Sequence, residues 1–251
     1  VRPIGALPAG QGENLVSKAF KAFWREFGLD SPPCGLRCEI LKNIPIGGGL
    51  GGGSSDAGSV LRHLEGIFGE AMAATSGLSS DQVHQRVMRA ALTCGADVPY
   101  AVVGGLCWVG GAGEEVAPIR VPQGSPSTAL ITIPPKPVST VAFYDRFRAL
   151  RPVVESKQDR LGRAFLSQGV TGDLLSLVEN DFELTAIELV PEIGQALRLM
   201  REVFPAGTAL TGSGSVCFSL VPGGMGEQAS KLANSLSAQG FACHLCELIF
   251  S

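Results

Sequence analysis

Apolar side chains recur at helical spacing along several parts of the chain. Between residues 13 and 28, Leu15, Ala19 and Phe23 fall on one face, and Gly28 is a suitable helix end. A second apolar face begins at residue 60, after a glycine-rich tract. The same spacing predicts further helices over residues 80–93, 140–150, 174–186, 191–203 and 227–237.

Shorter apolar runs between these helices are typical of strands. Such runs occupy residues 38–44, 129–133, 208–210, 216–221 and 242–250. We also expect Asp97, Val98 and Pro99 to open an apolar hairpin that passes through Val103, Trp108 and Val116. The second half of the chain therefore combines a sheet with helices on one side, and the whole chain is predicted to be α+β in two lobes.

A connector rich in proline, glycine and serine separates the two halves at residues 122–127. The chain has 251 residues, which is enough for two medium-sized domains, each with its own core. We place the first domain at residues 1–124 and the second at residues 125–251.

Charge and hydropathy narrow the class of partner. The chain has 20 Lys and Arg against 23 Asp and Glu, a net charge of −3, so it has no basic excess to follow a nucleic-acid backbone. Apolar runs stay well short of the roughly 18–20 residues that span a bilayer, and the first twelve residues lack a signal-peptide core. We expect a soluble cytoplasmic protein, monomeric or homodimeric, with a small-molecule partner rather than nucleic acid or a membrane.

Seven cysteines, an odd number in a chain of this size, favour reduced thiols over a disulfide framework. Two pairs, Cys34 with Cys38 and Cys243 with Cys246, are candidate metal ligands by spacing alone. On the predicted strands the first pair lies far apart and the second points to opposite faces, so neither pair suits one ion. We therefore interpret these four as buried structural cysteines.

Glycine is the compositional outlier, with 33 of 251 residues, and seven of them lie between residues 47 and 58. A predicted strand enters this tract and a predicted amphipathic helix leaves it. A glycine loop that runs into a helix start offers unpaired N–H groups and the positive end of the helix dipole, which suit phosphate oxygens. Ser54 and Ser55 add hydroxyls there that could bind phosphate or a phosphate-bound Mg²⁺. A flexible linker is the simpler alternative.

Two common phosphate loops do not fit the tract. No lysine follows the glycines, as the P-loop pattern requires. Gly47, Gly49 and Gly52 satisfy the spacing of the dinucleotide fingerprint, but that motif needs a second strand ending in an acidic residue about 20 residues on. The sequence that follows is helical instead, and Asp81 lies at a helix start.

The stretch PIGGGLGGGSSDA resembles the phosphate-binding motif of the GHMP kinases, and most of all that of the 4-diphosphocytidyl-2-C-methyl-D-erythritol kinases among them. The resemblance continues in GADVP at residues 95–99, VSTVAFY at 138–144, ENDFE at 179–183 and LTGSGSVCF at 210–218. It implies the two-lobed GHMP kinase fold, with an N-terminal ATP-binding domain and a ferredoxin-like C-terminal lobe. It also implies transfer of the γ-phosphoryl group of ATP, with Mg²⁺, to the 2-hydroxyl of a cytidine diphosphate-linked methylerythritol in isoprenoid precursor biosynthesis.

The resemblance also assigns roles to particular residues. It implies that Asp97 is the catalytic aspartate that orients the substrate hydroxyl, and that Tyr144 stacks on the cytosine of the substrate. Asn14 and Lys42 match positions that flank the adenosine pocket. The phosphate-binding positions correspond to Pro45, Ile46, Gly47, Gly48, Gly49, Leu50, Gly51, Gly52, Gly53, Ser54 and Ser55 and, in a third motif, to Gly212, Ser213, Gly214 and Ser215.

Simpler interpretations stand beside these roles. Residues 97–99 have the Asp-x-Pro pattern of a common turn. Lys42 is also compatible with an ordinary solvent-exposed lysine at the end of a strand. Tyr144 is also compatible with an ordinary amphipathic helix, and residues 212–215 with a plain hairpin turn.

One part of the family pattern has no counterpart in this sequence. The family begins with a strand that carries a catalytic lysine, followed by a Tyr-His pair that reads the cytosine. Here the first lysine is Lys18, inside a predicted helix, and the three histidines lie elsewhere. The first domain is therefore expected to lack the first strands of the fold, either because the chain is partial or because it is a diverged member. Three functions remain open: this kinase activity, another GHMP small-molecule kinase, or nucleotide binding without turnover.

Overall fold

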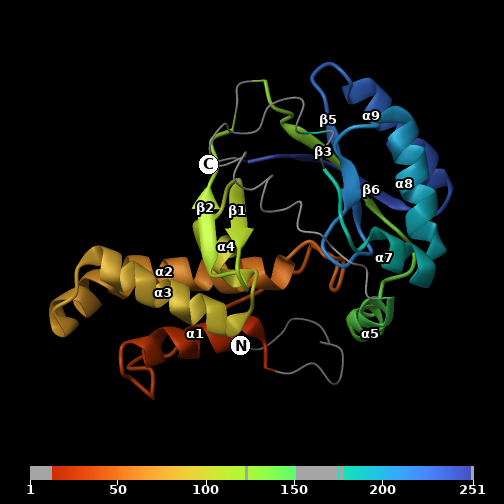
Figure 1. The fold of residues 1–251 in the computed structure, drawn as a ribbon. Helices are drawn as coiled ribbons and strands as arrows, with labels where there is room; N and C mark the ends of the chain where they lie inside the picture. Colours follow the sequence, from red (N-terminus) through yellow and green to blue (C-terminus); the bar gives the residue numbers. More distant parts are fainter. Residues whose placement is uncertain (1–12, 122–123, 151–174, 176–177, 250–251) are drawn as a thin grey trace. The chain divides into compact units, whose positions relative to one another are not determined.

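The computed structural model describes residues 13–121, 124–150, 175 and 178–249. The chain divides into two compact units (Figure 1). The first comprises the described residues of Val1–Asn43 together with Gly51–Pro118, and the second comprises Ile44–Leu50 together with the described residues of Ile119–Ser251. The glycine-rich tract thus passes from the second unit into the first between Leu50 and Gly51. The expected domain limits at residues 124 and 125 stay a prediction.

Four helices build most of the first unit. Their bounds are α1 Leu15–Glu26, α2 Gly52–Ser76, α3 Ser80–Cys94 and α4 Val98–Val103. The spacing of apolar residues predicted the first and last residues of α1 and α3 to within two positions. A capping box fixes the start of α3, because Ser79 accepts a hydrogen bond from Gln82 N and the Gln82 side chain accepts one from Ser79 N.

Helix α2 begins earlier than its apolar face indicated, inside the glycine tract itself. Gly51 stands at its N-cap with φ 66°, and the 25 residues that follow are helical. Helices α1, α2 and α3 share a core around Phe23, Trp24 and Leu61. The backbone of α2 also lies against α4 at Gly58, where an added Cβ would be 2.6 Å from the Ala101 carbonyl carbon.

Two strand predictions for this unit were wrong. Residues 98–103 form α4 rather than a strand, because Pro99 suits a first helical turn and the valines face α2 instead of a sheet. Residues 38–44 are not a strand, since none of their backbone groups pairs with another described strand. The hairpin is present but starts later, as β1 Cys107–Gly110 paired antiparallel with β2 Glu115–Pro118.

The second unit is built on a four-stranded antiparallel sheet in the order β4-β5-β3-β6. The strands are β3 Thr128–Ile133, β4 Thr208–Leu210, β5 Cys217–Val221 and β6 Ala242–Glu247. The helices are α5 Thr140–Leu150, α7 Glu183–Leu189, α8 Pro191–Val203 and α9 Gly226–Ala238. The succession β3, α8, β4, β5, α9, β6 in this strand order is the ferredoxin-like arrangement that was expected.

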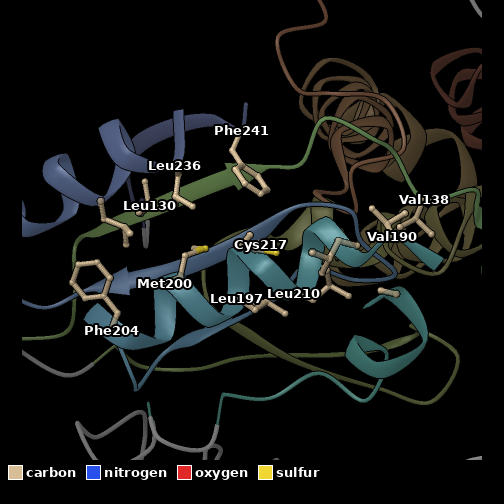
Figure 2. Packing of buried hydrophobic residues seen from close by; sticks show 14 of the residues in the cluster. Leu130, Val138, Val190, Leu197, Met200, Phe204, Leu210, Cys217, Leu236 and Phe241 are labelled. Atoms are coloured by element: carbon tan, nitrogen blue, oxygen red, sulfur yellow. The ribbon is translucent and has the colours of Figure 1, made fainter. Parts of the chain in front are cut away.

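Helices α8 and α9 cover one face of this sheet (Figure 1). Figure 2 shows side chains from both layers pointing into the same core, among them Leu130 and Cys217 from the sheet, Leu197 and Met200 from α8, and Leu236 from α9. This packing explains why the amphipathic patterns of α8 and α9 predicted their bounds to within one residue at each end.

The helix predicted over residues 174–186 was placed too early. Residues 174, 176 and 177 lie outside the described part of the chain, and residues 178–182 are not helical. The reason is local, because Asn180 Oδ1 accepts a hydrogen bond from Phe182 N at 2.9 Å and diverts the backbone into a turn. Helix α7 therefore begins only at Glu183.

The cysteine interpretation needs correction. All seven cysteines are free thiols, but Cys34 and Cys246 are exposed, and Cys38 and Cys243 are only half-buried. Cys34 and Cys38 lack the strand that would have buried them, and Cys246 lies on β6 at the edge of its sheet. The buried thiols are instead Cys94 and Cys217.

Candidate active site

The first half of the glycine tract packs against the turn that joins β4 and β5, within the second unit. The Gly48 carbonyl accepts hydrogen bonds from Val216 N at 3.1 Å and from Thr211 Oγ1 at 3.2 Å. Gly49 lies closer still, with φ 81°, and an added Cβ would stand 2.3 Å from the Thr211 carbonyl oxygen. The structure thus brings together two motifs, residues 45–50 and 211–216, that are more than 150 residues apart in the sequence.

Backbone donors in these two motifs are left open. The N–H groups of Gly47, Gly49 and Leu50 donate to no acceptor among the described residues, and the same holds for Gly212 and Ser213. Successive free N–H groups in a glycine turn form a concave anion-binding surface. The combination is typical of a phosphate-binding site.

The predicted residues of the β4–β5 turn differ in exposure. Gly212 is exposed and Ser213 half-buried, whereas Gly214 and Ser215 are buried. Within the described part of the chain, Gly214 N donates back to the Thr211 carbonyl oxygen at 2.8 Å. The tip of the turn is therefore available to a ligand, and its second half holds the turn on the sheet.

The second half of the tract starts helix α2, within the first unit. Gly51 caps the helix with no side-chain hydrogen bond, and Ser55 N is the first to donate back, to Gly51 O at 2.8 Å. Gly52, Gly53 and half-buried Ser54 leave their first-turn N–H groups unpaired within the described residues. The positive end of this 25-residue helix thus meets no hydrogen-bond acceptor from the described residues.

Lys42 is neither in a strand nor freely solvated. Its Nζ is bound to a carboxylate oxygen of Asp56, the fifth residue of α2, and about one third of each side chain is exposed. Sequence reasoning named Lys42 but missed Asp56, although the SSDA ending of the glycine motif contains it. The pair ties the segment before the tract to the helix after it.

Asn14 has a structural task that its sequence context could have predicted. It is the N-cap of α1, and its Oδ1 accepts a hydrogen bond from Val16 N at 2.9 Å. Its place beside an adenosine pocket stays a prediction.

Asp97 lies on a short loop between α3 and α4. It is exposed at the N-cap position of α4, and no described residue donates a hydrogen bond to its carboxylate. Residues on neighbouring elements fix the loop instead. Lys18 Nζ on α1 donates to the Cys94 carbonyl oxygen at 3.3 Å. Gly113 of the hairpin lies so close that an added Cβ would be 2.1 Å from the Ala96 carbonyl oxygen. The carboxylate is thus positioned by its loop and free to accept a proton or a hydrogen bond.

Tyr144 lies on α5, where 40% of it is exposed, against the rings of two phenylalanines. Phe143 is 5.5 Å away and Phe182 6.2 Å away between ring centroids, both edge-on. One side of the tyrosine ring system is fixed and the rest is open to a partner, an arrangement that suits stacking on a flat ring.

Sequence reasoning also missed the residues that support the β4–β5 turn. Asn180 Nδ2 donates to the carbonyl oxygens of Leu210 and Gly212, at 2.9 and 2.8 Å. The signal was present, because ENDFE places an asparagine three residues before the start of α7, where Asn side chains commonly organise turns. No group of three or more His, Cys, Asp or Glu residues within the described ranges is placed to hold a metal ion.

The comparisons with known proteins agree with this geometry. Residues 14–105 match the family described as GHMP kinases N terminal domain. The chain is 35% identical to 4-diphosphocytidyl-2-C-methyl-D-erythritol kinase of Geobacter metallireducens over 83% of this chain and 66% of that protein. Against the enzyme of the same name from Syntrophotalea carbinolica it is 30% identical over 93% of this chain and 75% of that protein.

The chain belongs to the 4-diphosphocytidyl-2-C-methyl-D-erythritol kinase family of the GHMP kinases. It spans between about two thirds and three quarters of the length of these relatives. A crystal structure of 4-(cytidine 5'-diphospho)-2C-methyl-D-erythritol kinase superposes with a TM-score of 0.66 at 28% identity, over 97% of this chain and 82% of that one. Homoserine kinase from Cytophaga hutchinsonii superposes with a TM-score of 0.69 at 19% identity, over 98% and 79%, and shares the fold. The GHMP kinase fold expected from the sequence is confirmed.

Proposed function

We propose that the protein is an ATP-dependent kinase that phosphorylates the 2-hydroxyl of 4-diphosphocytidyl-2-C-methyl-D-erythritol, a step of non-mevalonate isoprenoid precursor biosynthesis. The observation that carries the proposal is the packing of the glycine tract on the β4–β5 turn. Gly49 approaches the Thr211 carbonyl oxygen so closely that any side chain is excluded. Membership of the kinase family supports the substrate class.

ATP fits the donors that the structure leaves open. Unpaired N–H groups of Gly47, Gly49 and Leu50, and of the turn tip at Gly212 and Ser213, can donate to phosphate oxygens. The free first turn of α2, at residues 52–54, offers the same chemistry with the favourable end of a helix dipole. Each of these two sets of donors can bind phosphate oxygens of ATP.

Mg²⁺ suits this site because it is held mostly by phosphate oxygens and water, with only one or two protein oxygens. The hydroxyls of Ser54 and Ser55 are the protein oxygens at the helix start that would complete its shell. When bound, the ion would neutralise charge that develops on the transferred phosphoryl group.

Asp97 would orient the 2-hydroxyl of the substrate. Its carboxylate accepts no hydrogen bond from any part of the chain that the structure describes, so it can accept the hydroxyl proton as the oxygen attacks. In phosphoryl transfer such a group mainly positions the nucleophile, and electrostatic stabilisation carries much of the rest.

The remaining predicted residues would bind the two nucleotides. Tyr144 would stack on the cytosine, which adds affinity rather than base selectivity because every base has a flat face. Asn14 and Lys42 would border the adenosine pocket. Both side chains are fixed in position, Asn14 because it caps α1 and Lys42 because it pairs with Asp56.

The test is direct assay of the purified protein with ATP, Mg²⁺ and 4-diphosphocytidyl-2-C-methyl-D-erythritol, with ADP and the phosphorylated product quantified together. We expect stoichiometric formation of both. Mevalonate, homoserine and galactose serve as alternative acceptors, and preference for one of them would replace the proposed substrate by that of another GHMP kinase. Binding of an ATP analogue without product from any acceptor would instead identify a nucleotide-binding protein without turnover.

A further inference from the structure

Residues 180–183 contact both candidate ligand-binding elements of the second unit. The segment lies just before α7, and sequence reasoning gave it no task. Asn180 reaches the β4–β5 turn, Glu183 reaches β4, and Phe182 reaches the ring of Tyr144. Asn180 and Phe182 thus contact the elements that the proposed function assigns to ATP phosphates and to cytosine, and Glu183 contacts the strand that leads into the turn.

Asn180 uses both ends of its side-chain amide. Its Nδ2 donates to the carbonyl oxygens of Leu210 and Gly212, while its Oδ1 accepts from Phe182 N at 2.9 Å. These partners allow one orientation of the amide, because carbonyl oxygens need a donor and the N–H needs an acceptor. The Asn180 side chain therefore binds both Leu210 and Gly212, at the end of β4 and the start of the turn.

Glu183 and Arg201 extend the same support to β4. Glu183 Oε1 accepts from Leu210 N at 3.3 Å and from Arg201 at 2.7 Å, and its Oε2 accepts from the same guanidinium at 2.9 Å. Arg201 also donates to the Thr208 carbonyl oxygen at 3.2 Å. Charge-assisted hydrogen bonds of this kind fix geometry more strongly than neutral ones. Both ends of this three-residue strand are held by side chains from α7 and α8.

Phe182 supports the other element. Its ring lies edge-on to Tyr144 at 6.2 Å, to Phe143 at 5.1 Å and to Phe147 at 4.7 Å. Aromatic side chains have few rotatable bonds, and edge-to-face pairs restrict them further. Tyr144 is thus packed on the ring of Phe182, which follows Asn180 by two residues in the sequence.

We infer that residues 180–183 are a common support that positions the phosphate-binding turn through Asn180 and the cytosine-binding Tyr144 through Phe182. The inference rests on the proposed function for the identity of the two ligands. Asn180 and Phe182 are positioning residues, since each acts through another residue. Their effects are separable: Asn180 governs binding of ATP, and Phe182 governs binding of the cytidylyl substrate.

The first test uses Asn180→Ala and Asn180→Asp, with Asn234→Ala on the exposed surface of α9 as the matched control. Both Asn180 variants lose two donated hydrogen bonds, so the KM for ATP should rise about tenfold while the KM for the cytidylyl substrate stays within about twofold. An effect confined to the aspartate variant would show simple charge repulsion and overturn the inference.

The second test is the reciprocal variant, Phe182→Leu. We expect the KM for the cytidylyl substrate to rise about fivefold, with the KM for ATP unchanged. Equal changes of both KM values in the Asn180 and Phe182 variants would mean a general loss of folding and contradict separate positioning.

A third readout is independent of turnover. Hydrogen exchange reports on the amides of Gly214, bound to Thr211 O, and Val216, bound to Gly48 O. Peptides that cover residues 210–218 should exchange faster in both Asn180 variants and not in Asn234→Ala, whether or not the protein phosphorylates this substrate. Unchanged exchange there would overturn the inference, whereas faster exchange in a protein without kinase activity would overturn only the proposed function.

Discussion

The two candidate reactive regions are held in opposite ways. The β4–β5 turn is fixed by side chains on one side and by the glycine tract on the other: Asn180 binds its start, and Thr211 and Val216 bind Gly48. The loop that carries Asp97 is fixed through its backbone: Lys18 and the hairpin at Gly113 contact its start, Val98 N donates to Gly95 O, and Ala101 N donates to Asp97 O. Its carboxylate makes no hydrogen bond within the described residues.

The difference matches the two tasks that a kinase must divide. A phosphate cradle acts through N–H groups whose positions must not change, so its backbone is held from both sides. A carboxylate that orients a hydroxyl must keep its oxygens free for the substrate, so only its loop is held. Side chains thus bind the backbone in both regions, but no described side chain binds the Asp97 carboxylate itself.

Asp97→Asn should give the largest effect on turnover. The amide keeps the size of the carboxylate but cannot accept the hydroxyl proton, so kcat should fall about 100- to 10,000-fold. Because no described residue depends on the carboxylate, thermal unfolding should be unchanged. Steady-state kinetics and a melting curve check both expectations, and full activity in the variant would remove Asp97 from the reaction.

Gly49→Ala should act on the binding region instead. The new Cβ would stand 2.3 Å from a backbone oxygen at a position with φ 81°, so the tract and the turn must separate. We expect the affinity for ATP to fall at least about tenfold, with a loss of about 1–3 kcal/mol in unfolding free energy.

Gly224→Ala is the matched control for this variant. Its φ is 82°, but nothing lies within 4 Å of the added carbon, so it shares the backbone strain without the close contact. Nucleotide affinity in this control should be that of the wild type. Equal loss of ATP affinity in both variants would contradict a role for the close approach at Gly49.

Alkaline pH should produce the most gradual of the three effects, a loss of stability spread over several pH units. Burial raises the pKa of the Cys217 thiol, directly after the turn, to about 12, and the nearby Glu183 carboxylate adds to the shift. The folded protein therefore retains a proton that the unfolded chain releases near the ordinary thiol pKa. Stability is complete below that pH and falls as pH rises toward about 12, with a slope of up to about 1.4 kcal/mol per pH unit for this group.

Urea unfolding between about pH 8 and pH 10.5 measures that slope. Cys217→Ser, which does not titrate there, should flatten it. A remaining slope is expected from Cys94, Cys107 and Tyr100, whose pKa values burial also raises. An identical slope in the variant and the wild type would show that Cys217 does not contribute.

Periodicity predicted the elements that bury a regular face. Helices α8 and α9 pack one apolar side on the sheet, so their bounds could be predicted from spacing alone. Residues 38–44 form a short apolar run typical of a strand but pair with no described strand, because pairing depends on distant residues that a local pattern does not contain. Valines of α4 favoured a strand by propensity, and packing on α2 decided otherwise.

The candidate site was predictable in its motifs and not in its contacts. Glycine spacing indicated a phosphate loop, but only the fold shows that Gly48 and Gly49 meet Thr211 and Val216. The contribution of Asn180 was missed because its partners are 30 and 32 residues away in the sequence. None of the helices in the described part of the chain is long and apolar enough to cross a membrane.

Calorimetric titration of a non-hydrolysable ATP analogue into wild type, Asp97→Asn and Gly49→Ala tests the division between binding and reaction most directly. Asp97→Asn should bind the analogue within about threefold of the wild type, because the lost charge does not contact the phosphate-binding donors and a threefold change corresponds to only about 0.7 kcal/mol. Gly49→Ala should bind it at least about tenfold more weakly. Weak binding in Asp97→Asn together with unchanged binding in Gly49→Ala would contradict this division between binding and reaction.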